Sequence, residues 1–315
     1  MVVRLLAGGI ALAGAALLLV LYTGSPGARS ERAQAAPWTR APAMSHRRSY
    51  VAAAEWAGKI YVAGGMVGET GRHLAVFQRF DPRRGAWTTL PRLPEPIRAG
   101  AAAAVNGWIL VIGGSTPGGG GRQVFAYDVV RGRWERRAPL PEARYNHAAV
   151  ALGDTVYVLG GVGGHGERSE VFAYDPRRDA WSDTTELPKP MHAFGAVVFR
   201  GRIWAIGGRR DGRVLRSVWV YDPARGRWQR GPSLPKPMEL LGATVAGDEI
   251  HAVWEGTYQI FDGRLRTWRQ GPAPLVTRHA LSAFAVGQVL YTVGGCTTAL
   301  RDTQVVERRQ LAPGI

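Results

Sequence analysis

The side chains suited to metal or redox chemistry are few and scattered in this sequence. It contains one cysteine, Cys296, and seven histidines: His46, His73, His147, His165, His192, His251 and His279. A single cysteine excludes an internal disulfide and a multi-cysteine zinc site. Since no two histidines have a His-x-x-x-His spacing, a metal site would have to be assembled from distant segments. We therefore expect no metal and no cofactor, and we predict that Cys296 is a small buried residue.

Twelve residues stand at fixed distances before five Gly-Gly pairs and before Trp254. The pairs begin at Gly64, Gly113, Gly160, Gly207 and Gly294. Sixteen positions earlier stand Arg48, Ile97, Arg144, Met191, Met238 and Arg278. The positions that follow these are Ser49, Arg98, Tyr145, His192, Glu239 and His279. We call this set the rim. Brought together, its arginines, histidines and tyrosine would suit an anion such as a carboxylate or phosphate. Alternatively, the arginines hydrogen-bond to backbone carbonyls and bridge neighbouring units.

Acid–base chemistry at the rim would depend on Glu239, its only carboxylate. A glutamate among arginines stays ionised and can accept a proton from a substrate. We therefore name Glu239, His192 and Arg98 as candidate catalytic residues. The competing interpretation is that Glu239 forms an ion pair with a neighbouring arginine of the rim.

A repeat must bring the rim residues together, and the tryptophans define it. Trp38, Trp87, Trp134, Trp181 and Trp268 each precede a Gly-Gly pair by 26 residues, and Trp228 precedes Trp254 by the same distance. Asp81, Asp128, Asp175, Asp222 and Asp262 each follow an aromatic residue and precede a tryptophan by six positions. The chain therefore contains six repeats, of which the fifth is degenerate.

Each repeat is predicted to form four short strands. In the third repeat, the first strand covers residues 147–152, the second covers 155–161 and ends in Gly-Gly, and the third ends at Asp175-Pro176. The fourth strand carries Trp181. Asp and Pro favour a turn at this point, and glycines permit backbone angles that other residues avoid. Short strands separated by Gly and Pro turns indicate an all-β repeat protein.

These repeats resemble the kelch repeat over residues 38 to about 310. The resemblance implies a six-bladed β-propeller, with residues 38–311 as one domain and residues 1–37 as a separate leader. Trp38 has no strands of its own before it, and the last repeat has no tryptophan strand after it. We therefore expect residues 37–41 to be the outer strand of the last blade and to close the ring. An open array would leave two unpaired edges.

The kelch resemblance also implies which residues share a face. The variable segments after each Gly-Gly, together with the rim, would lie on one face, called the top. The turns between third and fourth strands would lie on the bottom, where ten arginines form what we call the bottom ring: Arg83, Arg84, Arg131, Arg133, Arg177, Arg178, Arg225, Arg227, Arg264 and Arg266. We hypothesise that this ring faces anionic lipid head groups. Alternatively, GC-rich coding accounts for the arginines, since only three of the 40 basic residues are lysine.

The N-terminus carries a targeting signal. After Arg4, residues 5–22 contain no charge, and such a run is either a membrane anchor or the core of a signal peptide. The Ala33-Gln34-Ala35 pattern lies well beyond this run, which favours an uncleaved anchor. In both cases we expect an extracytoplasmic protein, either anchored to the cytoplasmic membrane or secreted.

The sequence favours a binding module over an enzyme. The net charge of +16 does not by itself indicate a nucleic-acid partner, and the glycine run at 118–121 lacks the lysine and helix of a phosphate loop. We predict a monomer that binds a glycan, an anionic molecule or a protein at its top face. The alternative is a carbohydrate isomerase, because exported six-bladed kelch proteins include an N-acetylneuraminate epimerase.

Overall fold

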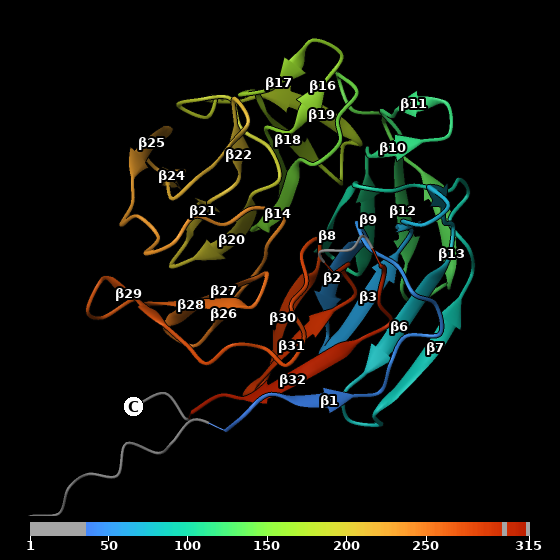
Figure 1. Ribbon diagram of the computed structural model, residues 1–315. Helices are drawn as coiled ribbons and strands as arrows, with labels where there is room; N and C mark the ends of the chain where they lie inside the picture. The colour runs from blue at the N-terminus through green and yellow to red at the C-terminus, as the bar shows by residue number, and fades with distance from the viewer. Residues whose placement is uncertain (1–35, 298–300, 313–315) are drawn as a thin grey trace, which may run out of the picture. The chain divides into compact units, whose positions relative to one another are not determined.

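The computed structural model describes residues 36–297 and 301–312. These residues form six four-stranded sheets and four two-stranded hairpins and contain no helix. The sheets are the blades of a propeller, with strands β2, β8, β14, β20, β26 and β30 around its centre (Figure 1). The predicted all-β, six-bladed kelch-type architecture is confirmed. The predicted anchor or signal peptide lies outside the described residues, as does the short hydrophobic helix expected there.

Blades 1 to 3 share one antiparallel plan, with a small hairpin between the second and third strands. Blade 1 contains β2 (Ala52–Trp56), β3 (Lys59–Ala63), β6 (Phe77–Asp81) and β7 (Ala86–Leu90), with hairpin β4 (Met66–Val67) and β5 (Arg72–His73). Blade 2 contains β8 (Ala101–Val105), β9 (Trp108–Ile112), β12 (Val124–Asp128) and β13 (Arg133–Arg136), with hairpin β10 (Ser115–Thr116) and β11 (Gly119–Gly120). Blade 3 contains β14 (Ala148–Leu152), β15 (Thr155–Leu159), β18 (Val171–Asp175) and β19 (Ala180–Asp183), with hairpin β16 (Val162–Gly163) and β17 (Gly166–Glu167).

Blade 4 follows the same plan, whereas blades 5 and 6 depart from it. Blade 4 keeps the hairpin and contains β20 (Gly195–Phe199), β21 (Arg202–Ile206), β24 (Val218–Asp222) and β25 (Arg227–Arg230), with β22 (Arg209–Arg210) and β23 (Arg213–Val214). Blade 5 has no hairpin and contains β26 (Gly242–Ala246), β27 (Glu249–Trp254), β28 (Thr257–Asp262) and β29 (Thr267–Gln270). Blade 6 contains β30 (Ser282–Val286), β31 (Val289–Val293), β32 (Val306–Gln310) and β1 (Thr39–Ala41).

The two ends of the chain complete the sixth blade together. Strand β1 pairs antiparallel with β32, and Thr39 lies opposite Arg308. Strand β1 therefore occupies the outer position that β7, β13, β19, β25 and β29 occupy in the other blades. This confirms the predicted ring closure by the N-terminal strand.

The tryptophan of each outer strand forms a hydrogen bond to the preceding blade. The indole Nε1–H donates to a backbone carbonyl of the preceding blade, and the accepting residue lies four positions after that blade's own tryptophan. The distance from nitrogen to oxygen is 2.8 Å in five blades and 3.0 Å in the other. The accepting residues are Pro272, Pro42, Pro91, Ala138, Thr185 and Pro232 for Trp38, Trp87, Trp134, Trp181, Trp228 and Trp268 in turn. The repeated tryptophan therefore links neighbouring blades around a closed circle.

Trp38→Phe removes this link between blades 6 and 5. Because the Pro272 carbonyl loses its donor, we expect the free energy of unfolding to fall by about 1–2 kcal/mol. Trp134→Phe is the matched control, since it removes the same bond between blades 2 and 1. Urea denaturation followed by circular dichroism measures both losses. An unchanged midpoint for Trp38→Phe would show that β1 does not contribute to closure through this bond.

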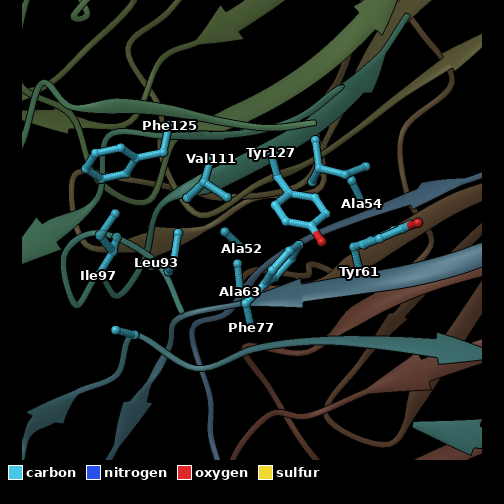
Figure 2. Close-up of a cluster of buried hydrophobic side chains, with 12 residues drawn as sticks. Ala52, Ala54, Tyr61, Ala63, Phe77, Leu93, Ile97, Val111, Phe125 and Tyr127 are labelled. Atoms are coloured by element: carbon cyan, nitrogen blue, oxygen red, sulfur yellow. The ribbon is translucent and has the colours of Figure 1, made fainter. Parts of the chain in front are cut away.

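Aromatic side chains fill the space between neighbouring blades. Between blades 1 and 2, Phe77 packs against Tyr127 with ring centroids 4.9 Å apart and against Trp134 at 4.8 Å. Val111 and Phe125 belong to the same buried cluster (Figure 2). The inner strands instead carry small residues such as alanine, because six of them converge around the central channel.

The Gly-Gly pairs lie where the second strand meets the next blade. In blade 1, Gly65 has a φ of +99°, and a Cβ there would approach the Ser49 carbonyl to 2.7 Å. Its N–H donates to the carbonyl of Ile97 in blade 2 at 2.8 Å. In the degenerate blade 5, Glu255 makes the equivalent bond to Arg278 at 2.7 Å. The contact between blades therefore requires a positive φ or a turn at this position.

Candidate functional site at the channel mouth

A ring of backbone hydrogen bonds lines the top of the central channel. In each blade, the residue after the rim pair has a φ between 44° and 55° and donates its N–H to the equivalent carbonyl of the preceding blade. These six residues are Tyr50, Ala99, Asn146, Ala193, Leu240 and Ala280. The donor–acceptor distances run from 2.6 to 3.4 Å. This closed ring holds the mouth at a fixed width and sets the direction of the side chains above it.

The first position of the rim does not face the mouth. Arg48 is fully buried, and Arg144 and Arg278 are each only 1% exposed. Their carbonyls accept hydrogen bonds from the preceding blade, while their side chains enter their own blade. This corrects the expectation that the three arginines line a ligand site. As the alternative expected, their side chains donate to backbone carbonyls, but these carbonyls belong to the arginine's own blade and not to a neighbouring one.

The three buried guanidinium groups are satisfied in different ways. Arg48 donates to the carbonyls of Gly64 and Val76 at 3.0 and 2.9 Å and to Gln78 Oε1 at 3.0 Å. Its burial lowers its pKa to about 9. Arg278 forms an ion pair with the buried Glu307, with Nη2 and Oε2 2.6 Å apart.

Arg144 is buried, but its two carboxylate partners are partly exposed to solvent. Its Nη2 lies 3.2 Å from both Glu142 and Glu170, and these two side chains are 49% and 32% exposed. Burial nonetheless lowers the pKa of Arg144. All three guanidinium groups therefore link the second and third strands of their own blades, or the segments that join them.

The second position of the rim does reach the mouth. Arg98, Tyr145, His192, Glu239 and His279 are partly exposed there, whereas Ser49 is buried. Short antiparallel bridges hold the backbone at these positions. The bridges pair Ser49 with Met66, Arg98 with Ser115, Tyr145 with Val162, His192 with Arg209, and His279 with Cys296. Five of the twelve rim residues, those at the second position other than Ser49, are therefore partly exposed next to the backbone ring of the mouth.

Glu239 is held by an arginine that the sequence analysis did not include. Arg209 Nη1 donates to both carboxylate oxygens of Glu239, at 3.1 and 3.2 Å. Nearby, His192 Nε2 lies 3.5 Å from Glu167 Oε1. Burial lowers the pKa of His192, although the two glutamates oppose this shift. This side of the mouth therefore combines an ion pair with a neutral imidazole.

On the other side of the mouth, Arg98 has no carboxylate partner among the described residues. Its Nη1 donates to the Met66 sulfur at 3.2 Å, and sulfur is a weak acceptor. The positive charge of Arg98 contributes to lowering the pKa of His73, for which burial is the main cause. The same charge opposes the burial that raises the pKa of Tyr50. A cationic side chain with unused donors therefore lies within electrostatic reach of the Tyr50 phenol.

Cys296 lies under this side of the mouth and is buried, as predicted. Its sulfur lies 3.1 Å from His279 Nε2, and burial raises the thiol pKa to about 11. A thiol with such a pKa is a poor nucleophile at neutral pH. Within the described ranges, no group of three or more His, Cys, Asp or Glu residues is placed to hold a metal ion.

The sequence analysis missed Tyr50, Asn146, Arg209 and Glu167 at the mouth. Tyr50 and Asn146 directly follow the rim pair, so an extension of the repeat register by one residue finds them. Arg209 and Glu167 lie in the top hairpins, where length varies between repeats and no register applies. Only the folded structure brings these hairpins to the mouth.

The bottom ring occupies the opposite face. All ten of its arginines are exposed and lie in or next to the turns between third and fourth strands. The aspartate that begins each of these turns accepts hydrogen bonds from the turn backbone, as Asp81, Asp128, Asp175, Asp222 and Asp262 do. Among the described residues, no helix is long and apolar enough to cross a membrane.

The fold and its polar channel mouth define a β-propeller of the kelch type. The family model of the KLHDC2/KLHL20/DRC7 Kelch-repeats domain matches residues 50–253, and the chain belongs to the kelch-repeat family. Alpha-scruin of Limulus polyphemus is 34% identical over 83 residues, which cover 26% of this chain and 9% of alpha-scruin. The solved structure of YjhT matches with a TM-score of 0.74 at 15% identity, and the match covers 84% of this chain and 95% of YjhT. The likeness to YjhT shows the fold.

Proposed function

We propose that this protein is an extracytoplasmic interaction module that binds the anionic group of a glycan or protein ligand at the channel mouth. Kelch-repeat propellers generally serve as interaction modules. The proposal rests on Arg98, whose guanidinium has only a thioether as its side-chain acceptor among the described residues. A carboxylate at this position would accept charge-assisted hydrogen bonds from Arg98. The backbone ring beneath keeps these donors in place before a ligand arrives.

The choice of ligand class follows from the charges at the mouth. Glu239 is already paired with Arg209, so its negative charge is balanced, whereas Glu167 lies close to the neutral imidazole of His192 and keeps its own charge. Arg98 remains without such a partner in the part of the chain that the structure describes. An acidic sugar offers a carboxylate for Arg98 and hydroxyl groups for Tyr145 and Asn146.

Arg98→Gln tests this proposal because it removes the charge and keeps a polar side chain. We expect the full-length protein to bind glucuronate in preference to glucose by isothermal titration calorimetry. Arg98→Gln should weaken glucuronate binding at least tenfold, since a hydrogen bond to a charged group contributes about 1.5–3 kcal/mol. Arg72→Gln, an exposed arginine on a top hairpin, is the matched control. Equal affinity for both sugars, or equal weakening by both variants, would contradict the proposal.

A second candidate function is carbohydrate isomerisation, which the position of Glu239 favours. Its side chain is 13% exposed and it lies at the mouth beside Arg209, so its carboxylate could accept a proton from a bound sugar. Glu239→Gln should then abolish anomer exchange of sialic acid, measured by proton NMR, and leave binding intact. Exchange at the buffer rate with the unmodified protein would exclude this function.

A further inference from the structure

We propose that the bottom face of the propeller docks on a bilayer surface that contains anionic lipids. The bottom ring supplies the charge. Its side chains extend into solvent, with exposures of 65% for Arg131 and Arg133, 75% for Arg177 and 84% for Arg178. Basic residues near a membrane are attracted to the negative surface potential of its anionic lipids.

Two acidic residues of this face, Asp128 and Asp222, lie deeper than the arginines with which they pair. The side chains of Asp128 and Asp222 are each 7% exposed, whereas their partners Arg131 and Arg225 are 65% and 59% exposed. Each aspartate is held by the turn, because its Oδ1 accepts backbone N–H groups. The pKa of Asp128 is lowered chiefly by the backbone N–H of Arg131 and that of Asp222 chiefly by the side chain of Arg225, so both carboxyl groups stay ionised. At these two turns, a flat anionic surface would therefore meet the guanidinium groups before the carboxylates.

Four arginines of the ring are also unpaired among the described residues. Arg83, Arg84, Arg227 and Arg266 have no carboxylate within salt-bridge distance there, in contrast to their neighbours Arg178 and Arg264. They lie in three different blades, so they present charge across the face rather than at one point. Such a distribution fits an extended surface better than a small anion.

Apolar side chains project from the same turns. Val130 is 90% exposed and Leu265 is 73% exposed, and both lie at turn tips beside ring arginines. The third large exposed apolar residue in the described ranges, Leu275, lies outside these turns. Apolar tips flanked by arginines match the boundary between head groups and acyl chains, where both kinds of side chain are stabilised. Nucleic acid would match the charge but not the apolar tips.

The path of the chain is consistent with this orientation. Strand β1 takes the place of a fourth strand, so its first residue, Thr39, lies at the bottom face with the other turns. The sequence before it contains the uncharged run at residues 5–22. The covalent link to that run therefore leaves the propeller from the face that carries the bottom ring.

The test uses full-length protein incorporated into vesicles, with an environment-sensitive fluorophore on single added cysteines. Val130→Cys and Leu265→Cys place it at the bottom tips, and Glu69→Cys places it on an exposed top hairpin. The native Cys296 is buried. In vesicles with phosphatidylglycerol we expect a blue shift of the bottom labels that is absent in pure phosphatidylcholine. The top label should not change.

Charge reversal then isolates the ring. We define the binding ratio as binding of the bottom face to anionic vesicles divided by its binding to neutral vesicles. This ratio should fall at least tenfold in the variant that combines Arg84→Glu, Arg227→Glu and Arg266→Glu. Salt at 0.5 M should lower the ratio of the unmodified protein to about the same degree. The control combines Arg72→Glu, Arg213→Glu and Arg301→Glu, three exposed arginines of the top loops, and should keep the ratio. Changing Arg84, Arg227 and Arg266 to Gln instead of Glu should lower the binding ratio less.

Three results would overturn the proposal. The first is bottom labels that respond equally to anionic and neutral vesicles. The second is an equal loss of binding in the top and bottom charge-reversal variants. The third is tighter binding of the bottom face to a DNA duplex than to anionic vesicles. The apolar N-terminal run is present in every variant, so it cannot account for differences between them.

Discussion

Glu307→Ala is expected to lower the free energy of unfolding by about 3–5 kcal/mol, because it leaves a buried arginine without its counter-charge. Arg278 and Glu307 are fully buried at the side chain, and their nearest atoms are 2.6 Å apart. Burial lowers the pKa of Arg278 and Glu307 raises it. The carboxylate also accepts the N–H of Val276 at 3.0 Å. Chemical denaturation monitored by tryptophan fluorescence measures the loss.

Two variants separate the charge from the packing. Glu307→Gln reproduces blade 1, where Gln78 accepts from Arg48 at 3.0 Å, and should cost about 1–2 kcal/mol. The pair Arg278→Met and Glu307→Leu removes both charges and should be closer to the unmodified protein than Glu307→Ala is. A loss below about 1 kcal/mol for Glu307→Ala would show that the blade admits water to Arg278.

Acidification is expected to destabilise the propeller through His147, whose burial lowers its pKa to about 3. In the unfolded chain, this imidazole titrates near its ordinary pKa of about 6.5. The unfolded state therefore binds a proton below that value while the folded state stays neutral. The contribution of His147 to the free energy of unfolding is therefore complete above about pH 6.5 and is lost as the pH falls towards 3. By pH 4 the loss is about 3 kcal/mol.

His147→Leu isolates this effect, because Leu241 and Leu281 occupy the same position in blades 5 and 6. The variant should lose about 3 kcal/mol less than the unmodified protein between pH 8 and pH 4. His165→Leu is the control, since His165 is exposed on a top hairpin. Urea denaturation at several pH values gives both slopes. Equal slopes for His147→Leu and the unmodified protein would show that His147 is protonated in the folded state.

The fold was predictable because each repeat carries its structure in a fixed register. The spacing between tryptophan and Gly-Gly defined the blades, and the unmatched Trp38 indicated that β1 completes blade 6. The tryptophan spacing did not reveal that each indole donates to the preceding blade. That bond depends on the twist and stacking of blades, which a linear pattern does not contain.

The candidate site was predictable only in part. The register placed both residues of each rim pair at one opening, yet the first position is buried, as at Arg48, and the second is partly exposed, as at Arg98. Successive residues of an extended chain point in opposite directions, so one of the two had to leave the mouth. Arg209 was not predicted because it lies in a hairpin whose length differs between blades.

The pairing of β1 with β32 also determines the order in which the protein can fold. Thr39 and Arg308 are neighbours in the sheet but lie at opposite ends of the chain. Strand β1 is synthesised first and has no partner until β32 appears, so the ring closes only after the last blade is made. Contacts so distant in sequence form slowly. Until then the outer edge of β32 remains unpaired, and it can recruit strands from other chains.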